Sequence, residues 1–151
     1  EVIEIGGFID RLDVVEEDSR SLLRIVDYKT GGKTETTSTV RDLFDHRGLE
    51  HKHYMMQTFI YALILHELSP ITTMLPIAPP LFFVNHARNP SFTPYLKLGG
   101  EPLTDFARIA DDFREHLTRL IAEVLDPSRP FRPTDDTRTC TSCPYYALCY
   151  Q

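Results

Sequence analysis

The stretch IVDYKTGGKT, from Ile25 to Thr34, decides between two folds for this chain of 151 residues. Its end, Gly31-Gly32-Lys33-Thr34, has the form of the end of a nucleotide-binding P-loop. Its middle, Asp27-Tyr28-Lys29, has the form of a metal-and-lysine catalytic element on a β-strand. The two interpretations are incompatible, and the neighbouring residues show which one applies.

The P-loop interpretation fails at its first position. A P-loop needs a glycine, four residues and then Gly-Lys-Ser/Thr, because the first glycine lets the backbone curl its N–H groups around phosphates. That glycine position is Asp27, whose carboxylate would face the phosphates. The residues after Thr34, Glu-Thr-Thr-Ser-Thr, also start a helix poorly, although a bound phosphate requires a helix N-terminus there. We therefore expect a strand.

A β-hairpin is the structure that this strand predicts. Val2–Val15 and Leu22–Lys29 are rich in β-branched and apolar residues, and the polar stretch Glu16–Ser21 separates them. We expect a connecting loop of about six residues. If the loop is centred between positions 18 and 19, residues whose numbers add up to 37 face each other. The resulting pairs are Val14 with Leu23, Asp13 with Arg24, Leu12 with Ile25 and Asp10 with Asp27.

This register brings two carboxylates and a lysine together. Residues two apart on a strand share a face, so Asp27 and Lys29 project together. Asp10 and Asp27 would lie opposite each other, where like charges destabilise a sheet unless they share a proton or bind a cation. Oxygen ligands in this number suit Mg²⁺, and Lys29 is placed to act on a water or on a phosphate charge. The alternative is an ordinary hairpin with one exposed Asp-Lys pair.

The rest of the chain predicts an α/β fold, with a mixed β-sheet and helices packed on it. On the helix predicted at His51–Leu68, Gln57 and Tyr61 are four residues apart and share a face. The other expected elements are a mobile connection at Thr30–Gly48, a loop at Leu75–Pro80, strands at Leu81–Val84 and Thr93–Leu98, and a long amphipathic helix at Thr104–Leu125.

Composition limits the class of protein. A hydrophobic fraction of 42% is enough for one domain with a normal core. A net charge of −6 argues against binding nucleic acid through global positive charge, although a carboxylate site that recruits cations remains compatible with it. The sequence contains neither a membrane-length apolar run nor a secretory leader, so we expect a cytoplasmic protein.

Three motifs resemble those of the PD-(D/E)xK nuclease superfamily. In chain order they are Gly7-Phe8-Ile9-Asp10-Arg11-Leu12-Asp13, Ile25-Val26-Asp27-Tyr28-Lys29-Thr30-Gly31 and Gln57-Thr58-Phe59-Ile60-Tyr61. The match is closest to the RecB-like branch, which includes the nuclease domains of the AddAB and RecBCD helicase–nucleases.

The resemblance implies a restriction-endonuclease-like core and a site. Asp10, Asp27 and the backbone carbonyl of Tyr28 would bind Mg²⁺ or Mn²⁺, and Lys29 would be the catalytic lysine. Gln57 and Tyr61 would position the substrate. The implied activity is metal-dependent, exonuclease-like hydrolysis of DNA in repair and recombination, with a helicase or helicase–nuclease subunit as partner. The alternative is a catalytically inactive DNA-binding or scaffold domain derived from such a nuclease.

All three cysteines, Cys140, Cys143 and Cys149, lie in the last twelve residues. Thiols this close suit a metal better than disulfides, but they leave a tetrahedral site one ligand short. The spacing resembles the C-terminal part of the 4Fe–4S motif of AddB-type nucleases, whose fourth cysteine precedes the nuclease motifs. Taken alone, the cysteines would also permit a small zinc-binding interaction module. We expect a nuclease core at residues 1–139, truncated at its N-terminus, with residues 140–151 packed on it.

Overall fold

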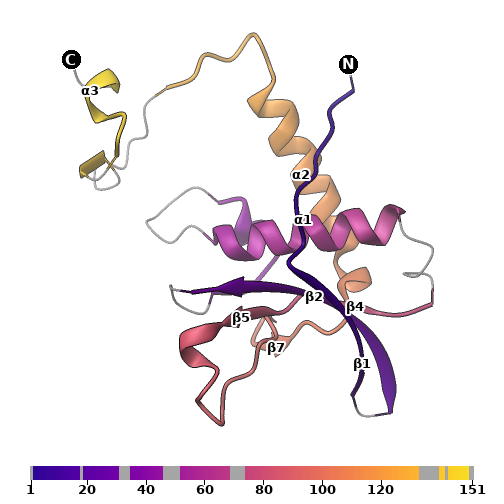
Figure 1. The fold of residues 1–151 in the computed structure, drawn as a ribbon. Helices are drawn as coiled ribbons and strands as arrows, with labels where there is room; N and C mark the ends of the chain where they lie inside the picture. The colour runs from indigo at the N-terminus through magenta and orange to yellow at the C-terminus, as the bar shows by residue number, and fades with distance from the viewer. Residues whose placement is uncertain are drawn as a thin grey trace.

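The computed structural model describes residues 2–17, 19–30, 35–45, 52–68, 74–132, 140–141 and 143–149. Figure 1 shows their arrangement. The strands are β1 (Arg11–Glu17), β2 (Arg20–Lys29), β3 (Thr36–Thr37), β4 (Ile77–Ala78), β5 (Leu81–Phe83), β6 (Lys97–Leu98) and β7 (Glu101–Pro102). The helices are α1 (His53–Leu68), α2 (Ala110–Val124) and α3 (Tyr146–Cys149), with 3-10 turns η1 (Arg41–Leu43), η3 (Val84–His86) and η4 (Phe106–Arg108).

The hairpin forms with the predicted register. β1 and β2 are antiparallel, and the pairs Leu12↔Ile25, Asp13↔Arg24 and Val14↔Leu23 all occur. The predicted loop of six residues is wrong, because pairing continues to Glu17↔Arg20 and only positions 18 and 19 connect the strands. Ser19 takes a left-handed conformation with φ of 64°, which suits a turn this short.

The first strand is shorter than predicted. Val2–Val15 is predicted to be strand, but among the described residues no strand pairs with residues 2–9, and β1 begins at Arg11. The apolar residues that suggested a strand are largely exposed, with Val2 90% and Phe8 94% accessible. Apolar, β-branched composition was a poor guide here because it indicates only a preference for strand, whereas a strand also needs a partner, and the described structure places none beside these residues.

β2 is central to its sheet. β1 lies on one side of it, and β4 and β5 lie parallel to it on the other. β4 and β5 follow one register, since Leu23↔Ile77 and Asp27↔Leu81 are both 54 residues apart. Pro79 and Pro80 separate them because proline has no amide hydrogen for the ladder. The predicted loop at Leu75–Pro80 therefore contains a strand, while the predicted strand at Leu81–Val84 is confirmed over Leu81–Phe83.

The helices pack on the face of β2 that carries Leu23 and Ile25, and Figure 1 shows α1 along the sheet with α2 beyond it. The predicted helix at His51–Leu68 is observed from His53. The predicted helix at Thr104–Leu125 is divided into η4 and α2. Phe59 of α1, Phe106 of η4 and Phe113 of α2 are fully buried and meet edge to face, with ring centres 5.6–5.9 Å apart. This arrangement adds to the stabilisation from their burial.

A second, smaller sheet joins β3, β6 and β7. The predicted mobile connection at Thr30–Gly48 contains β3 and η1 and buries Val40 and Leu43 within residues 35–45, while residues 31–34 and 46–48 lie outside the described residues. The predicted strand at Thr93–Leu98 is reduced to Lys97–Leu98, with one isolated bridge between Pro80 and Tyr95. Within the described ranges, none of the helices has the length and apolar character needed to cross a membrane.

Candidate active site

Asp27 and Lys29 form an ion pair at the end of β2. Lys29 Nζ lies 2.5 Å from Asp27 Oδ2, as the two-residue spacing predicted. Asp27 is only 6% exposed, on the face of the sheet that α1 covers. Its Oδ2 atom is buried and accepts no hydrogen bond of good geometry in the described structure. A buried carboxylate oxygen whose close partner is a single cation keeps capacity for a further ligand.

The lysine also reaches α1. Lys29 Nζ donates a 2.9 Å hydrogen bond to Gln57 Oε1, and Gln57 Nε2 donates a 3.1 Å hydrogen bond to Tyr61 Oη. The Lys29 ammonium lies 4.7 Å from the centre of the Tyr54 ring, within the range of a cation–π interaction. The structure therefore links Asp27, Lys29, Gln57 and Tyr61 by consecutive polar contacts, and it confirms that Gln57 and Tyr61 share one helix face.

Asp10 joins this group in a way that the sequence did not predict. The ladder ends at Arg11↔Val26, so Asp10 lies outside β1 and is not the cross-strand partner of Asp27. Its Oδ2 atom instead accepts a 2.9 Å hydrogen bond from the backbone N–H of Tyr28. That N–H belongs to the peptide between Asp27 and Tyr28. The Asp10 carboxylate, exposed to solvent, is thus fixed beside the end of β2.

Gly7 lies against Tyr61. A Cβ atom added at Gly7 would come within 2.7 Å of both Cε1 and Oη of the tyrosine, whereas one added at Gly6 would meet nothing within 4 Å. Only a residue without a side chain allows this close approach. Sequence reasoning included Gly7 in a motif but gave it no role, because its partner is far away along the chain.

Glu35 was missed altogether. Its carboxylate is 11% exposed and accepts hydrogen bonds from the backbone N–H groups of Met55, at 2.8 Å, and Tyr54, at 3.5 Å. These amides open α1, where the first N–H groups of a helix have no partner within the helix and a negative charge is favourable. Glu35 therefore fixes the start of the helix that carries Gln57. The separation of about twenty residues hides this contact from sequence patterns.

The donor set around Asp27 fits a small divalent cation. It comprises the carboxylate of Asp10, the carboxylate of Asp27 and the backbone carbonyl of Tyr28. The Asp27 Oδ2 atom is buried and accepts no hydrogen bond from the described residues. The part of the chain that the structure describes contains no group of three or more His, Cys, Asp or Glu side chains able to hold a metal. Two carboxylates suit Mg²⁺, which binds proteins through few side chains and keeps several waters.

The cysteines do not form such a group in the described residues. Cys140 is buried, Cys143 is partly exposed and Cys149 is exposed. The packing of residues 140–151 on residues 1–139 stays a prediction.

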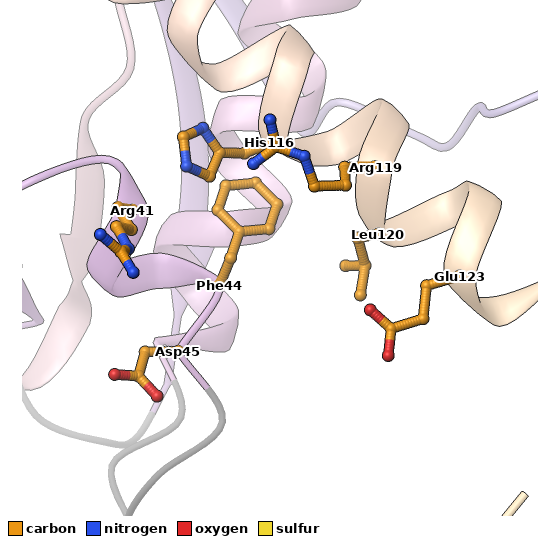
Figure 2. Close-up of a pocket in the computed structure, with 7 residues that line it drawn as sticks. All are labelled: Arg41, Phe44, Asp45, His116, Arg119, Leu120 and Glu123. Atoms are coloured by element: carbon orange, nitrogen blue, oxygen red, sulfur yellow. The ribbon is translucent and has the colours of Figure 1, made fainter.

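A hollow of about 640 Å³ lies elsewhere, between η1 and the C-terminal half of α2 (Figure 2). Its lining residues are Arg41, Phe44, Asp45, His116, Arg119, Leu120 and Glu123. The Arg119 guanidinium lies 2.5 Å from Glu115 Oε1, and His116 Nδ1 lies 3.2 Å from Asp112 Oδ1. None of the predicted site residues lines this hollow, so the polar contacts around Asp27 identify the candidate site better than cavity size does.

Comparison with protein families gives one match. The family model of the PD-(D/E)XK nuclease superfamily matches residues 1–150. Comparisons with curated proteins and with solved structures found no match. The mixed sheet flanked by helices agrees with the restriction-endonuclease-like fold of this superfamily. With a family match over nearly its whole length, the chain belongs to the PD-(D/E)XK nuclease superfamily.

Proposed function

We propose that this chain is the nuclease domain of a RecB/AddB-like DNA repair and recombination protein and that it hydrolyses DNA phosphodiester bonds. The observation that carries the proposal is the continuous polar chain from Asp27 through Lys29 and Gln57 to Tyr61, with Asp10 hydrogen-bonded to the Tyr28 amide. An ordinary hairpin with an exposed Asp-Lys pair would not bury the carboxylate or direct the lysine into a helix.

Asp10, Asp27 and the Tyr28 carbonyl are the proposed ligands of the divalent metal, either Mg²⁺ or Mn²⁺. Superfamily members generally use such metals. When bound, the metal supplies Lewis-acid stabilisation of negative charge on phosphate oxygen and lowers the pKa of water. Asp27 contributes a desolvated carboxylate that the fold holds in place, and the Tyr28 N–H restrains Asp10.

Lys29 is the proposed catalytic lysine. An ammonium group has three N–H donors. One of them is used in the hydrogen bond to Gln57 Oε1, and the ion pair with Asp27 Oδ2 holds the ammonium in place, so the group keeps donor capacity for a water or a phosphate oxygen. A fixed cation that donates to an oxygen where negative charge develops stabilises the transition state. Tyr61 restrains Gln57, and Gln57 restrains Lys29, so we assign Gln57 and Tyr61 to positioning of the site and the substrate.

The assignment to the RecB/AddB-like branch is supported by the order of the three motifs and by the Gln57–Tyr61 pair on one helix face. It brings with it an exonuclease-like activity, DNA as substrate, a helicase or helicase–nuclease subunit as partner and a cytoplasmic location. Each of these is part of the proposal.

The test is cleavage of end-labelled single-stranded and duplex DNA with Mg²⁺ or Mn²⁺, by the chain and by its Asp27→Asn variant. We expect progressive shortening from an end, which chelation of the metal stops and Asp27→Asn abolishes. Cleavage that persists in Asp27→Asn would disprove the assigned site. DNA binding without cleavage, at every metal concentration, would favour the catalytically inactive DNA-binding domain instead.

For the cysteines, we propose a 4Fe–4S cluster in the full-length protein, on their spacing alone. The described thiols do not gather into a metal site, so no part of the hydrolysis is assigned to them. Analysis of purified protein for iron, acid-labile sulfide and zinc tests this proposal. Iron with sulfide supports the cluster, whereas zinc alone supports a small structural zinc module.

A further inference from the structure

An aromatic row begins at Tyr28, on the face of β2 opposite the proposed site. It consists of Tyr28, Phe82, Phe92 and His86. Tyr28 pairs with Phe82 across β2 and β5, which lie side by side in Figure 1. The ring centres of Tyr28 and Phe82 are 6.0 Å apart, those of Phe82 and Phe92 are 6.4 Å apart, and those of Phe92 and His86 are 6.1 Å apart.

The rings of the row are partly exposed to solvent, unlike the apolar residues of the core. Leu22 and Val26, the apolar β2 residues on this face, are buried, yet Tyr28 is 41% exposed. Phe82, Phe92 and His86 are each partly exposed. Aromatic rings that remain partly exposed to solvent offer a flat apolar surface to a ligand.

Two arginines accompany the rings. The Arg11 guanidinium lies 5.4 Å from the centre of the Tyr28 ring, and the Arg24 guanidinium lies 5.9 Å from that of Phe82. Both arginines share the carboxylate of Asp13, at 2.8 Å and 3.2 Å. Glu17 also lies 3.6 Å from Arg24, so the two guanidinium groups next to the rings are balanced in charge by two carboxylates.

The segment that supplies three of the four rings contains no acid. The chain has 22 Asp and Glu residues and a net charge of −6, yet none of these acids lies between Leu68 and Gly100. This segment carries the exposed Arg88 in the turn between His86 and Phe92. A segment that carries aromatic rings and Arg88 but no acid is complementary to a polyanion with flat apolar groups.

The row starts at the site itself. The Tyr28 ring lies on one face of β2, while its neighbours Asp27 and Lys29 project from the other face. The Tyr28 N–H holds Asp10. A polymer bound at Asp10 and Asp27 can therefore pass around the end of β2 and reach Tyr28 within one residue of the metal ligands.

We infer that the aromatic row is a base-stacking surface for unpaired DNA nucleotides next to the phosphate that is cleaved. This inference rests on the proposed nuclease function and adds a surface to it. Stacking requires bases that are free of a duplex, since paired bases expose only their edges. Arg11 and Arg88 contact the phosphates between the stacked bases.

The test is fluorescence anisotropy with labelled oligothymidine and with a labelled hairpin duplex, in EDTA so that no cleavage occurs. Tyr28→Leu removes the ring and keeps the apolar volume, Tyr28→Phe keeps the ring, and Phe131→Leu removes a ring that is 87% exposed outside the row. We expect Tyr28→Leu to weaken oligothymidine binding about tenfold. Tyr28→Phe, Phe131→Leu and duplex binding should stay close to wild type.

Phe92→Leu and Arg11→Gln give a second route if Tyr28→Leu does not fold, as judged by circular dichroism. Each should also weaken oligothymidine binding selectively. Wild-type affinity in the folded ring-removing variants overturns the inference, as does an equal loss of single-strand and duplex binding. Cleavage with Mg²⁺ is measured in parallel. Ring-dependent binding without cleavage upholds the surface and rejects the nuclease proposal, whereas cleavage with ring-independent binding does the reverse.

Discussion

Lys29 Nζ and Gln57 Oε1 are 2.9 Å apart, although 28 residues separate them in the chain. This hydrogen bond ties the end of β2 to α1. It restrains the rotamers of a long side chain, and the Asp27 carboxylate restrains them further from the other side.

Lys29→Ala should abolish DNA cleavage, since it removes the donor directed at the developing charge. It leaves the carboxylates of Asp10 and Asp27 in place, so metal affinity should be largely kept. Cleavage rates and a Mg²⁺ titration followed by NMR check both parts. Lys97→Ala removes the same charge from β6, in the other sheet, and should cleave normally. Cleavage by Lys29→Ala at the control's rate would remove the lysine from the mechanism.

Gly7→Ala should lower both stability and cleavage. The added methyl group would come within 2.7 Å of the buried Tyr61 ring, which must shift and take Gln57 with it. Overpacking of this kind costs about 1–3 kcal/mol in the free energy of unfolding. Gly6→Ala is the matched control, because a methyl group there meets nothing within 4 Å. Denaturant unfolding compares the two variants, and equal stabilities would show that Gly7 has no packing role.

Glu35→Ala should destabilise the protein by about 1 kcal/mol, because two backbone N–H groups at the start of α1 lose their acceptor. Cleavage should also fall, since the helix end near Gln57 becomes less ordered. Glu35→Gln keeps an oxygen acceptor and loses only the charge, so its loss should be smaller. Thermal unfolding of the two variants measures the difference. A Glu35→Ala protein as stable as wild type would contradict the capping role.

Tyr95 predicts a loss of stability in alkali. Burial raises the pKa of Tyr95 from 10.0 to about 12, the nearby Glu17 carboxylate adds to the rise, and Arg24 opposes it. A folded-state pKa above the unfolded value means that folding favours the neutral phenol. The resulting stability is present below pH 10 and is lost as the pH rises towards 12.

Denaturant unfolding between these pH values, with Tyr95→Phe as control, isolates this contribution from that of other groups that titrate in alkali. The control lacks the ionisable hydroxyl and should lose less stability over the same range. Identical slopes for the two proteins would show that Tyr95 ionises equally in the folded and unfolded states.

Asp13 gives the opposite pH dependence. Burial raises its pKa, but hydrogen bonds and charge from Arg11 and Arg24 outweigh burial and lower the pKa below its ordinary value of 3.8. The stability from this pair is present above that value and is lost as the pH falls through the folded-state pKa. Asp13→Asn should therefore flatten the acid limb of the stability curve. NMR titration of the Asp13 carboxylate gives the direction of the shift directly.

The hairpin and the order of the motifs were predictable because they depend on local rules. Strand periodicity placed Asp27 beside Lys29, and helix periodicity placed Gln57 beside Tyr61. The register followed from matching apolar with apolar residues and acid with base, and the observed pairs agree with it. The loop length and the strand at Val2 were wrong, because polar composition and β-propensity do not show where pairing ends.

The sequence by itself determined the β-hairpin, its register and the chemical types of the residues on each face, because these follow from the backbone repeat and from side chains close in the chain. The tertiary structure alone decided that Asp10 accepts a hydrogen bond from the Tyr28 N–H, how close Gly7 comes to Tyr61 and that Glu35 caps α1. These contacts join segments 18 to 54 residues apart, so they depend on how the folded elements pack. No local pattern encodes the distance between two surfaces that meet only after packing.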